Sequence, residues 1–407
     1  MTHSTIAERL ATFAAELDVD KLPDAVRERA KACLIHAIVV GIAGSAADFG
    51  QQAEQASDGS IEQPDARGYA RSLVTGHWHP AAAAAFINGV HLHARAQEDT
   101  HGTFHPGVSV IPAALAAAES GHVDGKTFLA AVTAGYEVGI ALSAPLTELT
   151  TPPFRATAVF GPVAAAAAVG RILGLDAERM RSALSIAASM AGGTSESFGA
   201  GTDEWHFQAG AAAATGMMAA QLAEAKVTGS RTAFEADAGY LQCFARSGLS
   251  ADTIAGDLGT TWNILGVTFK PYPVCAFNQA PAMLGVRLRT SVAAEHVASI
   301  RLRMNEREAT YPGMRWIHVF LDNARYHHAK LVQAWLAQPG RRIKLHFIPA
   351  YCPHLNPIER LWGLMHRHTT HNKCYSSFKD FSIAMLNFVR DDVPRNWRTY
   401  CDEVTDN

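Results

Sequence analysis

Residues 205–223 read WHFQAGAAAATGMMAAQLA, and this stretch decides the fold class. It contains no Asp, Glu, Lys or Arg, although polar side chains interrupt it at His206, Gln208, Thr215 and Gln221. Leu and Ile are nearly absent, so small side chains dominate and allow neighbouring helices to approach closely. These features favour a tightly packed, buried helix over a membrane span.

Apolar periodicity predicts further helices. The first begins after Ser4-Thr5, a pair that can cap it, and its apolar residues are Ile6, Leu10, Phe13 and Leu17. A second begins at Pro23, and its expected buried face is formed by Val26, Ala30, Leu34 and Ile38. Further helices are expected over 80–95, 109–119, 126–144, 161–173, 178–190 and 206–226, whereas strand character is expected only late, from 299–304.

The composition is that of a globular protein. Hydrophobic residues make up 48% of the 407 residues and charged residues 18%, which excludes a disordered or collagen-like chain. The six cysteines are scattered without a CxxC pair, which argues against a disulfide framework or a zinc ribbon. The N-terminus shows no apolar signal core. We therefore expect a cytoplasmic protein without membrane contact.

Charge divides the chain into two parts. From Arg315 onward, 13 Lys and Arg stand against 8 Asp and Glu, whereas the first 314 residues hold 22 against 30. The later part also reads differently, with strands expected at Ile317–Leu321 and Ile343–Ile348 and helices at Lys330–Leu336 and from Ile358. Strand, helix, strand and helix in this order predict a parallel α/β arrangement.

The densest polar cluster is HLHARAQEDTHGTFHPG, residues 91–107. Its carboxylates and histidines suit a divalent metal ion, but no metal-binding spacing fixes them. A histidine held by a carboxylate also suits proton transfer near neutral pH. As a purely structural alternative, Asp99 and Thr100 would cap the helix expected near Pro106.

A second cluster is FKPYPVCAFNQ, residues 269–279. Its two prolines predict a rigid extended loop that would hold Lys270 in place for carboxylate binding or proton transfer. The alternative is a surface lysine in a domain crossover. Cys275 has no histidine partner nearby in sequence, so a nucleophilic thiol is not expected.

Five strings in order resemble the MmgE/PrpD family: HPG at 105–107, VIPAALAAAE at 110–119, GYEV at 135–138, LGLD at 173–176 and KPYPVC at 270–275. The family includes 2-methylcitrate dehydratase, cis-aconitate decarboxylase and iminodisuccinate epimerase. The resemblance covers about residues 5–313. It implies a mainly α fold with a large helical domain over 1–265 and an α+β lid over 266–313, truncated here. It also implies a homodimer and metal-free, cofactor-free acid/base chemistry on small di- or tricarboxylates.

Carried over position by position, the resemblance places His105, Lys270, Tyr311 and Asp99 as catalytic residues. Thr100 also stands at a family active-site position, and we predict that Thr100, Arg155, His206 and Cys275 bind the substrate. The sequence departs from the family pattern at three positions: Arg155 replaces a histidine, Trp205 a lysine and Ala96 an acidic residue. These departures favour an epimerase-like reaction, in which His105 and Lys270 or Tyr311 exchange an α-proton while Arg155 and Lys270 hold carboxylates.

The later part resembles the C-terminal region of mariner-like DDE transposases of bacterial insertion sequences. LDNARYHH at 321–328 and PHLNPIERLW at 353–362 carry this resemblance, which covers about 315–407. It implies a partial RNase H-like α/β segment in which Asp322 and Glu359 are remnants of a two-metal site. Because the upstream carboxylate is missing, no transposase activity is expected.

The sequence thus predicts an MmgE/PrpD-type lyase or isomerase, impaired by truncation and by fusion to a transposase fragment. The alternative is a transposase-derived DNA-binding remnant without catalytic activity. Weak, non-specific binding of nucleic acid by the basic tail is compatible with either interpretation.

Overall fold

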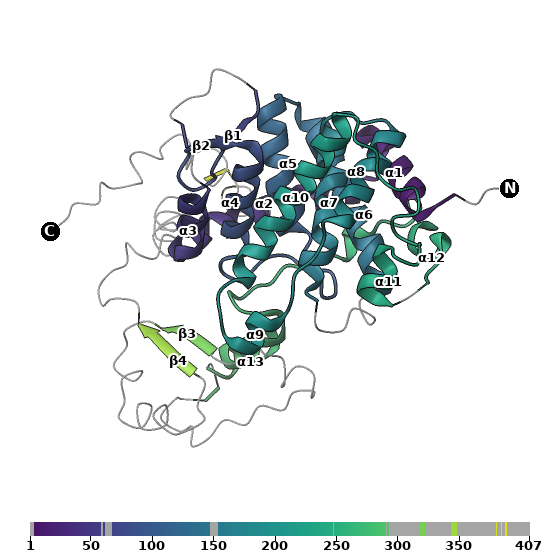
Figure 1. The fold of residues 1–407 in the computed structure, drawn as a ribbon. Helices are drawn as coiled ribbons and strands as arrows, with labels where there is room; N and C mark the ends of the chain where they lie inside the picture. Colours follow the sequence, from purple (N-terminus) through teal and green to yellow (C-terminus); the bar gives the residue numbers. More distant parts are fainter. Residues whose placement is uncertain are drawn as a thin grey trace. The chain divides into compact units, whose positions relative to one another are not determined.

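The computed structural model describes residues 4–57, 60–61, 67–146, 154–246, 248–289, 291–292, 317–321 and 343–347, with residues 380, 384, 387 and 388. The chain separates into two compact units, Met1–Arg315 and Trp316–Asn407, and each is described by itself. Helices dominate the described part of the first unit, so the predicted mainly α class is confirmed there (Figure 1).

The helices of the first unit follow one another along the chain. They are α1 (Ile6–Glu16), α2 (Asp24–Ala43), α3 (Asp48–Ala56), α4 (Ala81–His93), α5 (Gly107–Gly121), α6 (Gly125–Ser143), α7 (Ala156–Ile172), α8 (Ala177–Ser189), α9 (Glu196–Ala200), α10 (Trp205–Glu224), α11 (Tyr240–Ala245), α12 (Ala251–Ala255) and α13 (Gln279–Leu288). The helices expected from periodicity are all present, with ends shifted by a few residues.

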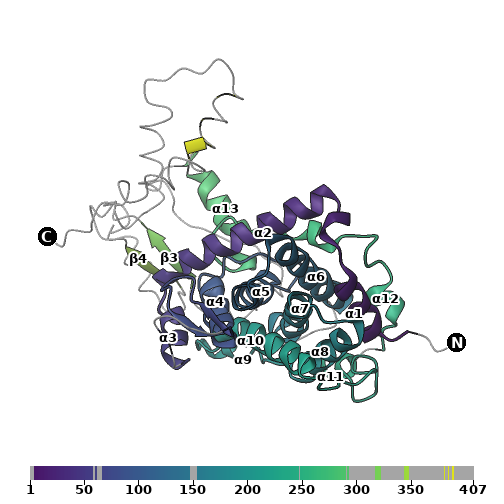
Figure 2. The ribbon, with the colours of Figure 1, turned by 90° about the horizontal axis from the view of Figure 1, so that it is seen from above.

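The core is centred on α7, in which every residue except Arg171 is buried. Helices α10 and α6 pack most extensively against it. Seen from above, α5 and α7 lie inside the bundle, with α2, α4, α6, α8 and α10 around them (Figure 2). The stretch 205–223 falls within α10, and its small buried residues pack on α7 and α4 as predicted.

Glycines set the spacing between these helices. A Cβ atom on Gly216 of α10 would lie 2.5 Å from the Pro162 carbonyl oxygen and 2.7 Å from the Ala166 nitrogen, both in α7. A Cβ on Gly89 of α4 would lie 2.7 Å from the Gly210 Cα of α10. The two crossings therefore bring backbone against backbone, which alanine would prevent.

Local sequence signals explain the first two helices, with one correction. Thr5 caps α1 through a capping box with Glu8, as the Ser4-Thr5 pair predicted. On α2, Val26 and Ala30 are buried, but Leu34 and Ile38 are only half-buried. The buried face of α2 therefore differs from the predicted one beyond Ala30, because it is formed by Cys33, Ala37 and Val40.

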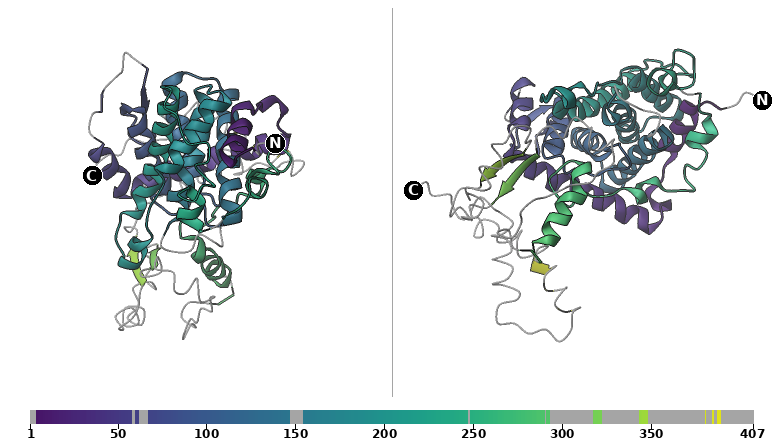
Figure 3. Two further views of the ribbon diagram at one scale, coloured as in Figure 1. Left: turned by 45° about the vertical axis from the view of Figure 1, so that its right-hand side comes forward. Right: turned by 90° about the horizontal axis from the view of Figure 1, so that it is seen from below.

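Helix α2 runs along the outside of the bundle (Figures 2 and 3). Ile35, Val39 and Ile42 are therefore exposed, at 63%, 58% and 54%. By length and composition alone, two helical stretches would be able to cross a membrane, Asp24–Ala46 and Gly125–Leu146. The apolar window of the second is 83% buried within the protein, as is usual for a core helix.

Strand character is not confined to the late part of the chain, so that prediction is wrong. Strands β1 (Tyr69–Arg71) and β2 (Trp78–Pro80) form an antiparallel pair before α4. Three-residue strands are too short to show an alternating pattern in the sequence. Glu54 of α3 connects this hairpin to α3. It accepts a hydrogen bond from the Thr75 hydroxyl and contacts the rings of His77 and His79.

In the second unit, β3 (Ile317–Leu321) and β4 (Ile343–Phe347) pair in parallel, with Ile317 opposite Ile343. The two predicted strands and their parallel arrangement are confirmed. The strand expected at 299–304, the helices expected at Lys330–Leu336 and from Ile358, and the predicted site residues Tyr311, Asp322 and Glu359 lie outside the described residues.

Candidate active site in the first unit

The site is built on the loop between α4 and α5, which carries Glu98, Asp99, Thr100 and His105. Thr100 pairs through its backbone with Thr268, and both N···O distances are 2.9 Å. This pairing fastens the loop to the extended segment that carries Lys270. The two polar clusters recognised in the sequence are therefore side by side in the structure.

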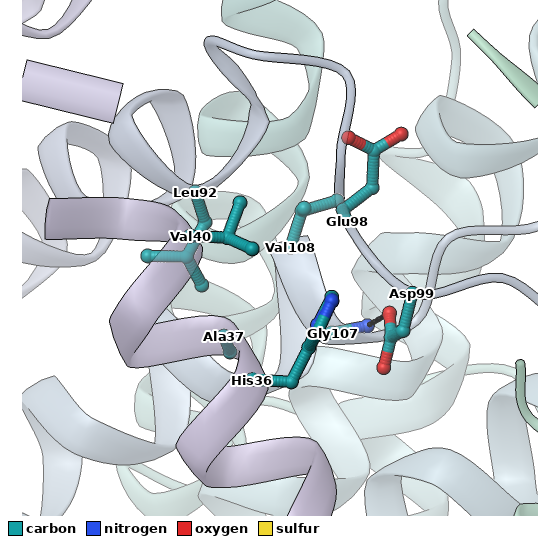
Figure 4. Close-up of a pocket in the computed structure, with 8 residues that line it drawn as sticks. All are labelled: His36, Ala37, Val40, Leu92, Glu98, Asp99, Gly107 and Val108. Atoms are coloured by element: carbon teal, nitrogen blue, oxygen red, sulfur yellow. Dashed lines mark hydrogen bonds between the residues drawn. The ribbon is translucent and has the colours of Figure 1, made fainter. Parts of the chain in front are cut away.

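Glu98 and Asp99 are adjacent in sequence, but their carboxylates point in different directions (Figure 4). Asp99 accepts hydrogen bonds from the Gly107 N–H at 2.9 Å and from the Tyr136 hydroxyl at 2.5 Å. It thus caps the start of α5, as the structural alternative predicted, whereas the Thr100 hydroxyl donates to the Gly102 carbonyl. Burial raises the pKa of Asp99 to about 6. A catalytic role for Asp99 stays a prediction.

Glu98 faces the opposite side and pairs with Lys270. The distance from Lys270 Nζ to Glu98 Oε1 is 2.5 Å, and both side chains are only 3% exposed. Lys270 also donates to the Ala96 carbonyl at 3.0 Å. Burial pushes the pKa of Glu98 up, but the charge of Lys270 holds it well below its usual range. The interpretation of Lys270 as a surface lysine is therefore wrong.

Two histidines complete this cluster. His105 donates from Nδ1 to the Asp99 backbone carbonyl at 3.0 Å, which leaves Nε2 unprotonated and 3.5 Å from Glu98 Oε1. His93 Nδ1 lies 3.2 Å from Glu98 Oε2, within ion-pair range, although at an angle short of a well-formed hydrogen bond. Burial, followed by the charge of Lys270, holds the pKa of His105 well below its usual range. His105 is therefore a neutral base at neutral pH.

Arg155 is the residue directly before α7, and its guanidinium donates hydrogen bonds to acceptors of the protein. Its guanidinium donates to His93 Nε2, to the Trp205 carbonyl at 2.5 Å and to Gln208 Oε1 at 3.3 Å. It also lies 5.4 Å from the ring centres of Phe198 and Trp205. Arg155 thus adds positive charge next to His93, while its predicted contact with substrate remains a prediction.

His206 and Cys275 lie at the edge of the cluster. The His206 ring stacks on Phe49 with centres 3.7 Å apart and lies 6.2 Å from the His93 ring. Burial lowers the pKa of His206 to about 2, so this imidazole is neutral. Cys275 is half-buried, and its burial raises the pKa of the thiol, in keeping with the expectation that it is not a nucleophile.

Glu98 and His93 are the residues that the sequence reasoning missed. Both lie in the cluster 91–107, but the family pattern directed attention to Asp99 and His105. The signal in the sequence was the pair of consecutive carboxylates, Glu98 and Asp99. Glu98, and not the predicted Asp99, makes the ion pair with Lys270.

A small pocket lies beside the cluster, between α2, α4, the site loop and α5. Its lining includes His36, Leu92, Glu98, Asp99 and Gly107 (Figure 4). It leaves essentially no room for a water molecule, whereas ligand pockets typically hold roughly 300–1,000 Å³. Within the described ranges, no cluster of three or more His, Cys, Asp or Glu has the arrangement of a metal site.

Comparison with known proteins identifies the family of this part of the chain. The family model for the MmgE/PrpD N-terminal domain matches residues 8–250. The chain belongs to the MmgE/PrpD family. A second model, for a DDE superfamily endonuclease, matches residues 282–382, so the chain joins the two families, as the sequence predicted.

Several curated relatives of this MmgE/PrpD chain are named as cis-aconitate decarboxylases. The protein from Aspergillus terreus is 26% identical over 80% of this chain and 66% of its own length. The human protein is 28% identical over 77% of this chain and 63% of its own length. A cis-aconitate decarboxylase-like protein, oryM of Aspergillus oryzae, is 28% identical over 65% of this chain and 58% of its own length. The chain thus spans about three fifths of the length of these relatives.

Proposed function

We propose that this MmgE/PrpD chain is a cytoplasmic lyase or isomerase that removes an α-proton from a small di- or tricarboxylate. The observation that carries the proposal is a neutral His105 beside the buried Lys270–Glu98 pair. His105 Nε2 is free of its own hydrogen and accepts the proton, and the Glu98 carboxylate stabilises the resulting imidazolium. The curated cis-aconitate decarboxylases support a tricarboxylate as the substrate class.

Lys270 supplies the positive charge for a substrate carboxylate. Its ammonium is a compact point charge with three hydrogen-bond donors, of which Glu98 and the Ala96 carbonyl take two. A substrate carboxylate would accept the third. Charge drawn toward that carboxylate as the α-proton leaves is then stabilised in a site from which water is excluded. The choice between epimerisation, dehydration and decarboxylation depends on where the proton is returned or which group departs.

Ligand binding tests this proposal without requiring turnover. We expect citrate-like tricarboxylates and smaller dicarboxylates to raise the melting temperature of the full chain. Lys270→Met should abolish the shift, whereas the control Lys126→Met, at an exposed lysine, should keep it. A shift that is equal in both variants would contradict carboxylate binding by Lys270.

The match of residues 282–382 to the endonuclease family supports reduced activity in this fusion. We further propose a homodimer.

As a second candidate function, the match to the endonuclease family supports a DNA-binding remnant that binds through the basic tail. Binding of the full chain to duplex DNA, weakening steeply with salt, would favour it, and no binding at low salt would exclude it.

A further inference from the structure

Glu98 stands at the centre of the buried cluster. Its Oε1 atom lies 2.5 Å from Lys270 Nζ and 3.5 Å from His105 Nε2, and its Oε2 atom lies 3.2 Å from His93 Nδ1. We propose that Glu98 is the positioning residue of this site, which holds Lys270 and His93 in place beside His105. The inference rests on the proposed function for its catalytic consequence, but the positioning itself can be measured separately.

Both oxygens of Glu98 face hydrogen-bond donors. Lys270 and Arg155 can only donate, and Arg155 donates to His93 Nε2. Neutral His93 therefore carries its hydrogen on Nδ1, the nitrogen that faces Glu98 Oε2. A carboxylate accepts on both sides, whereas a glutamine amide accepts on one side and donates on the other. Glutamine at position 98 would therefore have to give up either Lys270 or His93.

Charge gives the same result. Lys270 and Arg155 are buried cations. Glu98 is paired with Lys270, whereas Arg155 donates to His93, and the neighbouring titratable groups are His93, His105 and His206. Burial lowers the pKa of all three histidines, so they add no counter-charge and no further positive charge at neutral pH. Without Glu98, the Lys270 ammonium would remain buried beside a second cation. Because an unpaired buried charge is costly, Lys270 would leave its position toward water.

Amine labelling of the folded full chain tests the positioning directly. We expect Lys270 to be protected from acetylation in the wild-type chain, and Glu98→Asp, which keeps the charge, to preserve much of that protection. In Glu98→Gln, labelling of Lys270 should be faster by roughly tenfold or more, because the position opens. Exposed Lys126 serves as the internal reference. Unchanged protection in Glu98→Gln would overturn the proposal.

The adjacent carboxylate supplies a matched control. Asp99 contacts Gly107 and Tyr136, so Asp99→Asn should leave Lys270 protected. If Glu98→Gln does not fold, the double variant Glu98→Gln/Lys270→Met decides. Removal of both charges should restore a folded chain that Glu98→Gln alone does not give. A double variant that also fails to fold would overturn the proposal, since the role of Glu98 would then not depend on Lys270.

An activity measurement separates this inference from the function on which it rests. The rate of α-proton exchange should fall roughly tenfold or more in Glu98→Gln and recover in part in Glu98→Asp. Faster exchange in Glu98→Gln would overturn the positioning role, because Glu98 would then be blocking the place of the substrate. No exchange in the wild-type chain, with Lys270 still released in Glu98→Gln, would contradict the proposed function alone.

Discussion

The Tyr136 hydroxyl donates a hydrogen bond to Asp99 Oδ2 across 2.5 Å, and both side chains are buried. The other oxygen of Asp99 accepts the Gly107 N–H. One carboxylate thus joins the middle of α6, the site loop and the first turn of α5. The loop that also carries Glu98 and His105 is therefore fixed by a contact outside the proposed chemistry.

Removal of the tyrosine hydroxyl should measure this link. Tyr136→Phe leaves a buried carboxylate without one of its donors, and we expect a loss of about 1.5–3 kcal/mol in the free energy of unfolding. Tyr240→Phe is the matched control, because the Tyr240 hydroxyl donates at 2.8 Å to the neutral Val159 carbonyl. Its loss should be smaller, about 0.5–1.5 kcal/mol. Denaturant unfolding compares the two, and equal losses would argue against a charged Asp99.

The pKa of Asp99 predicts a pH dependence of stability. Because burial raises this pKa from 3.8 to about 6, the folded protein binds more protons than the unfolded chain between these values. The contribution of Asp99 to stability is therefore full below about pH 4 and is lost as the pH rises to about 6, by about 3 kcal/mol. The difference in unfolding free energy between the wild-type and Asp99→Asn chains should change by this amount across this pH range. Parallel pH curves would contradict the prediction.

The close crossing of α7 and α10 predicts sensitivity at Gly216. A methyl group there would contact the Pro162 carbonyl and the Ala166 nitrogen, and we expect Gly216→Ala to cost about 1–3 kcal/mol. At Gly285 of α13, no atom of the described residues lies within 4 Å of such a methyl group. Gly285→Ala should therefore be neutral or stabilising by up to about 1 kcal/mol. Thermal unfolding tests both, and an unchanged Gly216→Ala would contradict the observed helix spacing.

Much of the fold could be predicted because the helices carry strong local signals. The Thr5 cap and the small residues of α10 led to the correct elements, whereas the three-residue strands β1 and β2 left no periodic pattern. In the site, Lys270 and His105 were found from their motifs. Glu98 was missed because a sequence does not show toward which side a loop carboxylate turns, and in this case Asp99 turned toward Gly107.

The hairpin β1–β2 should loosen when its attachment to α3 is removed. Burial alone would raise the pKa of Glu54, but hydrogen bonds from Thr75, His79 and His77 hold it below its usual value of 4.5. Its stabilising contribution is therefore present above pH 4.5 and is lost as the pH falls through the lower folded-state pKa. We expect Glu54→Gln to speed amide hydrogen exchange at residues 69–80 at pH 7. Unchanged exchange there, with the rest of the bundle as reference, would count against this attachment.

His105 is the proposed base of a carboxylate-binding site in this MmgE/PrpD chain. The most direct measurement is α-proton exchange in D₂O, followed by NMR across a panel of small di- and tricarboxylates. We expect exchange into at least one compound by the folded wild-type chain and its loss in His105→Ala. Exchange that persists in His105→Ala, or none by a wild-type chain that binds the panel, would contradict it.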